Sequence, residues 1–162
     1  MEIIKTRIMR GPNYWSTNRH RLIVLTIQLT ENENALGEAD LHALGAKLEK
    51  LKPSLHHLRE YTSVLDVVAQ AAIEIQCLAG MDCAHAVVQS TAQPLLFEVI
   101  FSYTVERAGV DAGKAAVHLV NALLTEQNYE LFPTIQDLKE LRERGGLSTE
   151  EGLTRRVPRP QE

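Results

Sequence analysis

Hydrophobic and polar positions along the chain follow two different periods, and the shorter period comes first. Residues 2–9 and 20–30 alternate apolar and polar side chains, which is typical of β-strands with one buried face. In the second strand, the more apolar face carries Ile23, Leu25, Ile27 and Leu29. The opposite face carries Leu22, Val24, Thr26 and Gln28. Residues 31–38 are polar and acidic without a period, and we predict a loop there.

Two helical stretches follow. Residues 39–51 place a leucine at every third or fourth position, and Asp40 is the expected N-cap. Residues 63–80 carry a wider apolar face. Ser63 is placed to cap the start of this second helix, and Gly80 is placed just beyond its end, where glycine tolerates a left-handed conformation.

The second half of the chain repeats the order of strands and helices. Two strand-like stretches and two helical ones are predicted at residues 84–91, 94–106, 111–127 and 135–144. Thr134 and Asp137 are spaced like a capping box at the start of the last helix, which we expect to end at Gly145. The order ββααββαα predicts an α+β fold: a mostly antiparallel sheet of about four strands with helices packed on one face.

Composition fits one globular domain. The chain has 162 residues, of which 44% are hydrophobic and 23% charged. No apolar run approaches the roughly 20 residues of a membrane span, and the N-terminus lacks the apolar core of a signal peptide. Cys77 and Cys83 have no metal-site spacing, and we expect two reduced thiols in a cytoplasmic protein that binds no membrane. Residues 1–146 are the expected domain, and the charged, proline-containing residues 147–162 the expected linker.

Charge is unevenly distributed. The formal net charge is −4, but residues 1–21 carry five basic side chains and one acidic side chain. A basic end on an acidic body favours either local contact with an anion or another domain, or simply a solvated strand edge. Tyr14 and Trp15 lie among these arginines, as in some proteins that bind single-stranded nucleic acid. The acidic body opposes binding to a polyanion, so we expect no nucleic-acid partner.

Motifs of catalysis are missing from the sequence. It contains no glycine-rich phosphate loop and no nucleophile elbow. It has six histidines, but His56 and His57 are adjacent and would diverge by about 100° on a helix, so they do not chelate one metal. We therefore predict no catalytic residue, no metal site and no cofactor in this chain.

Three segments carry a family resemblance. The opening "IMRGPNYWS" at 8–16, followed by "RLIVLTIQL" at 21–29, resembles the start of the cyanophycin synthetase family, which opens with an "LRGPNYWS"-type signature. The segment "AAIEIQCLAGM" at 71–81 is similar to the family's "ALELQxLAGM". The stretch 97–124 is similar to a third family segment, a strand followed by an alanine-rich helix.

The resemblance implies a role within a larger enzyme. Members of this family use ATP and Mg²⁺ to make cyanophycin, a poly-aspartate chain with arginine on each side-chain carboxylate. The resemblance assigns this chemistry to downstream ATP-grasp and Mur-ligase-like domains. The chain would then be a non-catalytic N-terminal domain that binds the growing polymer and docks on the ligase domains, within an expected homo-oligomer. The alternative is a purely structural spacer that supports oligomerisation.

One departure from the family bears on catalysis. Many members carry an HxxEH-type motif, a plausible zinc-hydrolase site that could trim polymer into primers. The corresponding positions here are Asp66, Ala69 and Gln70. They provide no imidazole, so we do not expect this chain to hydrolyse the polymer.

Two sets of residues are candidate sites. A polymer with both signs of charge calls for a surface with both signs, and we predict that the polymer binds at Lys47, Lys50, Lys52, Arg59 and Glu60. A solvated helix face is the alternative for this set. The opening signature supplies the second set: Arg10, Gly11, Pro12, Asn13 and Trp15. Glycine and proline favour a turn, and Trp15 faces the core, a neighbouring domain or the polymer.

Overall fold

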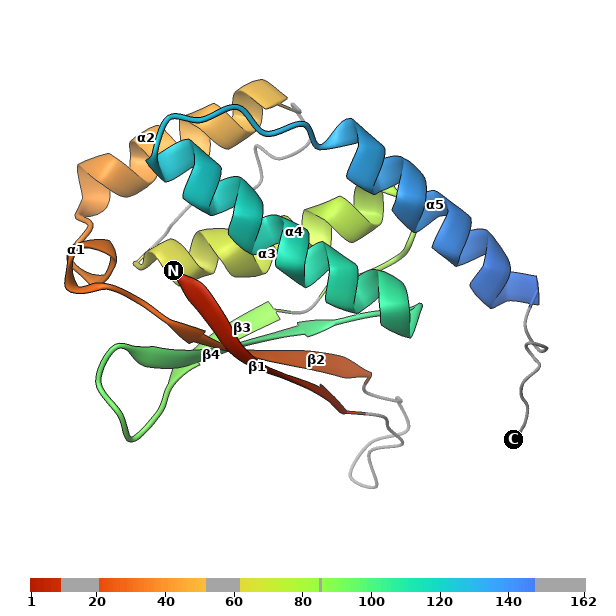
Figure 1. Ribbon diagram of the computed structural model, residues 1–162, viewed down its shortest axis with the longest axis horizontal. Coiled ribbons are helices and arrows are strands. Elements are labelled where there is room, and N and C mark those ends of the chain that lie inside the picture. Colours follow the sequence, from red (N-terminus) through yellow and green to blue (C-terminus); the bar gives the residue numbers. More distant parts are fainter. Residues whose placement is uncertain (10–20, 52–61, 85, 148–162) are drawn as a thin grey trace.

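The computed structural model describes residues 1–9, 21–51, 62–84 and 86–147, and no side chains at 49–51 or 145–147. The elements in chain order are β1 (Glu2–Met9), β2 (Leu22–Gln28), α1 (Glu31–Asn34), α2 (Glu38–Leu51), α3 (Val64–Leu78), β3 (Ala86–Ser90), β4 (Leu96–Ser102), α4 (Glu106–Leu124) and α5 (Phe132–Leu147). The predicted α+β class and order of strands and long helices are confirmed (Figure 1).

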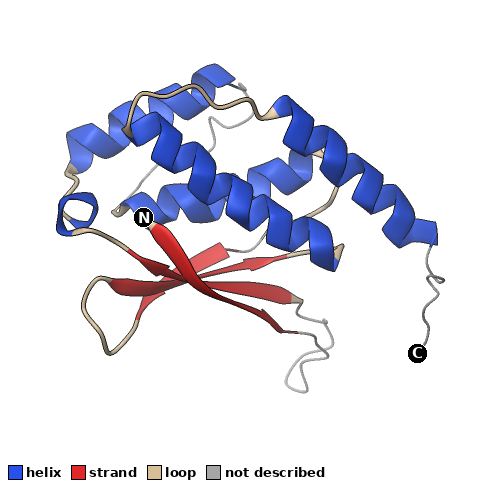
Figure 2. Cartoon of the chain, viewed as in Figure 1, coloured by secondary structure: helices blue, strands red, loops and turns tan. Residues whose placement is uncertain are grey.

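The four strands form one antiparallel sheet in the order β1-β2-β4-β3. The β2 strand lies inside the sheet, where Ile23 is paired with Ile8 of β1 and with Phe101 of β4. Helices α3 and α4 pack together over one face of this sheet, and α2 and α5 pack against α4 (Figure 2). The helices therefore lie on one side, as the alternation of the strands predicts.

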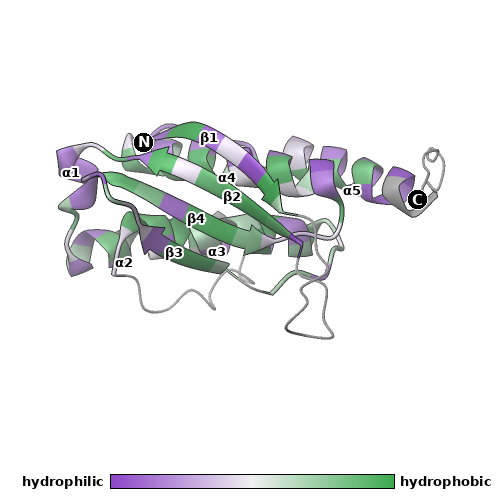
Figure 3. Cartoon of the chain, turned by 90° about the horizontal axis from the view of Figure 1, so that it is seen from below, coloured by the Kyte–Doolittle hydropathy of each residue, from purple (hydrophilic) through white to green (hydrophobic). Residues whose placement is uncertain are grey.

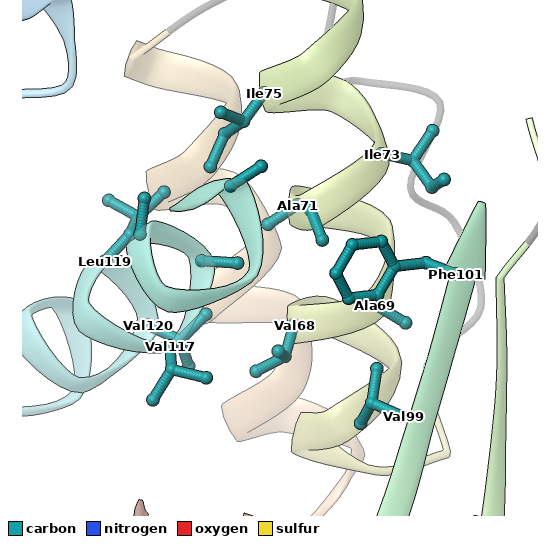
Figure 4. Packing of buried hydrophobic residues seen from close by; sticks show 14 of the residues in the cluster. Val68, Ala69, Ala71, Ile73, Ile75, Val99, Phe101, Val117, Leu119 and Val120 are labelled. Atoms are coloured by element: carbon teal, nitrogen blue, oxygen red, sulfur yellow. The ribbon is translucent and has the colours of Figure 1, made fainter. Parts of the chain in front are cut away.

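The core lies between the sheet and the α3–α4 pair. The predicted apolar face of β2 is buried in it: Ile23, Leu25, Ile27 and Leu29. Phe101 of β4 belongs to the same buried cluster as Val68 and Ala71 of α3 and Leu119 and Val120 of α4 (Figure 4). The helical period of α3 and α4 thus correctly identifies the faces that pack.

The α3 helix has the predicted ends. Ser63 is its N-cap and accepts a hydrogen bond from the Leu65 amide, and Asp66 completes a capping box. Gly80 follows the C-cap with a φ of +90°, a left-handed conformation that favours glycine.

Four predicted boundaries are wrong. The predicted loop at 31–38 contains α1, because Thr30 and Glu33 form a capping box with each other. The α2 helix already begins at Glu38, so Asp40 lies in its first turn and is not its N-cap. The α4 helix begins at Glu106, five residues before the predicted start at 111.

The fourth correction concerns α5. This helix begins at Phe132 and runs to Leu147, so Pro133 lies in its first turn, where proline is tolerated, and Thr134 and Asp137 do not cap it. Gly145 and Gly146 lie within the helix instead of ending it. Across the part of the chain that the structure describes, no helix is both long enough and apolar enough to span a membrane.

Candidate functional site

One face of the sheet has no described helix over it (Figure 3). The side chains that alternate away from the core point to this face, which we call the uncovered face. From β1 and β2 they are Lys5, Arg7, Met9, Leu22, Val24, Thr26 and Gln28. From β4 and β3 they are Leu96, Glu98, Ile100, Ser102, Val87 and Gln89. The less apolar of the two predicted faces of β2 is part of it.

A polar network crosses the uncovered face. The Arg7 guanidinium reaches over β2 to Glu98, with Nη2 3.3 Å from Oε2. The other carboxylate oxygen of Glu98 accepts a hydrogen bond of 2.7 Å from Nε2 of Gln89. Both ionic side chains remain partly exposed, so their pairing contributes at most about 1 kcal/mol to stability. The network therefore fixes the positions of opposite charges on an open surface more than it stabilises the fold.

Apolar side chains lie beside this network. Met9 is 45% exposed and Val87 is 54% exposed, whereas Leu22 and Ile100 between them are partly buried. Val24, although on this face, is only 1% exposed, flanked by Arg7 and Ile100 in the paired strands. A surface that combines exposed apolar side chains with a charged, hydrogen-bonded group is typical of an interaction site.

The predicted polymer-binding residues are only partly described. Lys47 is exposed on α2, and its Nζ donates a hydrogen bond of 3.3 Å to the Leu123 carbonyl in the last turn of α4. A cation at a helix C-terminus stabilises the helix, so Lys47 has a structural contact of its own. Lys50 lies in α2, but its side chain is not described. The remaining members of the set lie outside the described residues: Lys52, Arg59 and Glu60.

The signature turn also lies outside the described residues. This applies to Arg10, Gly11, Pro12, Asn13 and Trp15. The segment that holds them joins β1 to β2, between Met9 and Leu22, two residues of the uncovered face.

Two of the three positions that correspond to the HxxEH-type motif, Asp66 and Ala69, serve the fold here. The Asp66 carboxylate accepts hydrogen bonds from the Thr62 amide at 2.8 Å, the Thr62 hydroxyl at 2.9 Å and the Ser63 amide at 3.1 Å. Ala69 is buried in the core. Among the residues that the structure describes, no three His, Cys, Asp or Glu side chains are grouped to hold a metal ion. Asp66 thus organises the start of α3.

The segment 71–81 forms the second half of α3 and the turn after it, and it contacts the sheet. Gln76 is fully buried, and its Nε2 donates to the Ser102 carbonyl at the end of β4 at 3.0 Å and to the Ala72 carbonyl at 3.3 Å. Its Oε1 accepts from the Cys83 thiol at 3.3 Å. Burial raises the pKa of Cys83 to about 11, so the thiol keeps the proton that it donates. Each polar atom of the Gln76 side chain therefore has a partner.

The third segment of the resemblance, 97–124, brings α4 close to the sheet. A Cβ placed on Gly109 would lie 2.6 Å from the Cβ of Tyr103, and one on Gly113 would lie 2.8 Å from the Phe101 ring. Only glycine fits at this separation. Both the second and the third segment therefore have structural roles in the described part of the chain.

The second and third segments both lie in the range that a protein-family model matches. Residues 40–125 match the model of the cyanophycin synthase-like N-terminal domain, and these residues include α3 and α4 with their packing against the sheet. The chain belongs to this family. The matched range covers more than half of the chain.

Curated relatives of the family extend the match over nearly the whole chain. The cyanophycin synthetases of Geminocystis herdmanii and Synechocystis sp. are each 33% identical over 98% of this chain. That of Trichormus variabilis is 35% identical over 87% of the chain. The matched part makes up 21% of the first two proteins and 17% of the third. The chain thus spans about a fifth of the length of these relatives, which contain further domains.

The sequence indicated the β2 residues of the uncovered face but not its charged pair. Arg7 and Glu98 are 91 positions apart, and no sequence pattern links the two. The alternation of the strands was a usable signal, because Glu98 has the opposite phase to the buried Val99 and Phe101. It could identify a second face, but only the strand order β1-β2-β4-β3 shows that Glu98 shares this face with Arg7.

Proposed function

We propose that this chain is the polymer-binding and docking module of a cyanophycin synthetase and has no catalytic activity of its own. Its family membership and its share of about a fifth of its relatives' length support a role as one part of a larger protein. In this proposal ATP and Mg²⁺ are used by the remaining domains. The use of Asp66 to begin α3 further supports a non-catalytic role.

The observation that carries the docking role is the uncovered face. A sheet normally buries both faces or leaves a polar one to solvent, but this face exposes Met9 and Val87 beside the Arg7–Glu98 pair. An apolar surface with fixed charges at its side offers a neighbouring domain both buried area and a defined orientation. The face is therefore the proposed contact with the ligase domains.

The polymer-binding role is proposed for the charged surface around α2. Cyanophycin, as the family resemblance describes it, presents a carboxylate and a guanidinium on every repeat. Exposed ion pairs are worth about 0–1 kcal/mol each, so many of them together hold a chain that can still slide. Lys47, Lys50 and Lys52 with Arg59 and Glu60 supply both signs of charge at α2 and directly after it.

Isothermal titration of the chain with Asp-Arg oligomers of increasing length tests the binding role. We expect affinity to rise steeply with length and to fall with salt, because exposed ion pairs are screened. The double variant Lys50→Glu, Lys52→Glu should weaken binding, and it leaves the contact of Lys47 with α4 intact. Lys114→Glu with Arg144→Glu is the matched control, since it reverses two other exposed charges. No binding by the unmodified chain would instead favour the structural spacer.

A further inference from the structure

We propose that Cys77 and Cys83 form a redox-sensitive pair, which a small disulfide oxidises to an internal disulfide bond that loosens the end of α3 from the sheet. This inference goes beyond the proposed function and rests on the fold alone. The two residues are the only cysteines of the chain, so a single internal disulfide is possible. Its effect falls on the contact between α3 and β4, which Gln76 makes.

The two cysteines lie on opposite sides of the turn that ends α3. Cys77 is in the last turn of the helix, Gly80 turns the chain with a φ of +90°, and Cys83 follows three residues later. The thiol of Cys77 donates a hydrogen bond of 3.4 Å to the backbone carbonyl of Cys83. The side chain of the first cysteine therefore already reaches the backbone of the second in the folded chain.

The two thiols differ in their access to solvent. Cys77 is exposed, whereas Cys83 is only 6% exposed and its thiol donates a hydrogen bond of 3.3 Å to Oε1 of Gln76. A small molecule in solution meets Cys77 first, so Cys77 is the attacking thiol and Cys83 the resolving one. An exposed cysteine beside a second, resolving cysteine is the usual arrangement of a thiol pair that forms a disulfide reversibly.

The oxidation is an exchange of disulfide bonds with oxidised glutathione, a small disulfide. The Cys77 thiolate attacks one glutathione sulfur, so a mixed disulfide forms and one glutathione leaves as a thiolate. The Cys83 thiolate then attacks Sγ of Cys77, which forms the internal disulfide and releases the second glutathione. The two protein thiols lose two protons and two electrons in total, and one glutathione disulfide becomes two glutathione thiols.

The rate of this exchange depends on pH. Partial burial raises the pKa of Cys77, and the charges of Glu74 and Asp82 raise it further. Burial raises the pKa of Cys83 to about 11. Only a small fraction of either thiol is therefore ionised at neutral pH, and the rate should rise about tenfold for each unit of pH near neutrality. The pair thus responds to a lasting change in the balance of thiols and disulfides and not to a brief pulse of oxidant.

Oxidation removes a buried hydrogen bond. The sulfur of Cys83 has no proton to donate in the disulfide, so Oε1 of the fully buried Gln76 loses that bond. A buried acceptor left without its donor is destabilising. The same side chain donates through Nε2 to the Ser102 carbonyl at the end of β4. We therefore expect the oxidised chain to hold the end of α3 less firmly against the sheet.

Intact-mass measurement of the folded chain, incubated with oxidised glutathione and then acidified, tests the pairing. We expect the unmodified chain to lose about 2 Da and to regain it with dithiothreitol. Cys83→Ser, whose hydroxyl can still donate to Gln76, should stop at the mixed disulfide and gain about 305 Da. Cys77→Ser should react at least about tenfold more slowly than Cys83→Ser, because its remaining thiol is buried. Thermal melting confirms that both variants are folded.

Hydrogen exchange measures the effect on the fold. Residues 76–83 should exchange at least about threefold faster in the oxidised chain than in the reduced one, because local opening there becomes easier.

Any of three results would overturn the proposal. In the first, the unmodified chain keeps two free thiols or stops at the mixed disulfide. In the second, Cys77→Ser reacts as fast as Cys83→Ser. In the third, the internal disulfide forms but the hydrogen exchange of residues 76–83 is unchanged. None of these results bears on the binding of Asp-Arg oligomers, so this proposal and the proposed function are tested separately.

Discussion

One buried residue of the family signature, Gln76, serves the packing of the fold and not a functional site. Gln76 is a polar side chain in an apolar core, which is a common sign of function. Its hydrogen bonds to Ser102 and Ala72 and from Cys83 instead tie the end of α3 to the end of β4. The packing of α3 against β4 therefore accounts for this residue of the signature.

Replacing Gly109 by alanine should reverse the usual effect of this substitution in a helix. Alanine normally gains up to about 1 kcal/mol over glycine there, but the added Cβ would meet the Cβ of Tyr103 at 2.6 Å. Overpacking costs about 1–3 kcal/mol, so we expect Gly109→Ala to lower the free energy of unfolding measured in urea. Gly37→Ala is the control, since nothing lies within 4 Å of its added Cβ. A Gly109→Ala variant as stable as the unmodified chain would contradict the close packing of α4.

At the scale of elements, a small polar cluster joins the start of β1 to α1 and α4. The Met1 ammonium forms an ion pair with Glu33 and donates a hydrogen bond of 3.0 Å to Oδ1 of Asn121, whose Nδ2 donates to the Met1 carbonyl. Partial burial raises the pKa of Glu33, but the Met1 ammonium and the hydrogen bonds with Thr30 outweigh it and lower the pKa below its ordinary 4.5. The charged form of Glu33 is thus favoured in the folded chain.

This cluster predicts a pH dependence with a definite sign. A carboxyl group with a lowered pKa stabilises the fold above its unfolded pKa, and the stabilisation is lost as the pH falls. Between about pH 5 and pH 3, the melting temperature of the unmodified chain should therefore fall more than that of Glu33→Gln. Glu31→Gln, in the same short helix, should behave like the unmodified chain. Equal pH profiles for Glu33→Gln and the unmodified chain would show that the cluster contributes nothing.

The sequence predicts those features of the fold that leave a local pattern, such as a hydrophobic period. The alternation of β2 and the apolar faces of α3 and α4 identified the core, because burial imposes those periods directly. The start of α1 was missed although Thr30 and Glu33 have capping-box spacing. The start of α4 was missed because residues 94–106 were predicted as one strand, whereas β4 ends at Ser102 and α4 begins at Glu106. The uncovered face depends on pairing between distant strands, which no local pattern contains.

At the scale of the whole molecule, docking through the uncovered face and docking through the helical layer predict different effects of two substitutions. Met9→Asp changes the uncovered face, and Phe132→Asp changes a 70% exposed side chain at the start of α5. If the sheet face docks on the ligase domains, Met9→Asp should destabilise this domain more in the full-length protein than in the isolated chain, by about 1 kcal/mol or more. Phe132→Asp should have the same effect in both. Pulse proteolysis measures both differences, and equal effects of Met9→Asp in the two contexts would place the docking surface elsewhere.

The most direct test of the central claim, that this domain holds the polymer for the ligase, is elongation by the full-length enzyme on short and long primers. The account predicts that Lys50→Glu with Lys52→Glu slows elongation on long primers, because only these reach the charged surface around α2. Short primers and ATP binding should be unaffected, as should every property of the control with Lys114→Glu and Arg144→Glu. Normal elongation of long primers by the Lys50, Lys52 variant would contradict the claim and move the search to the basic residues 1–21.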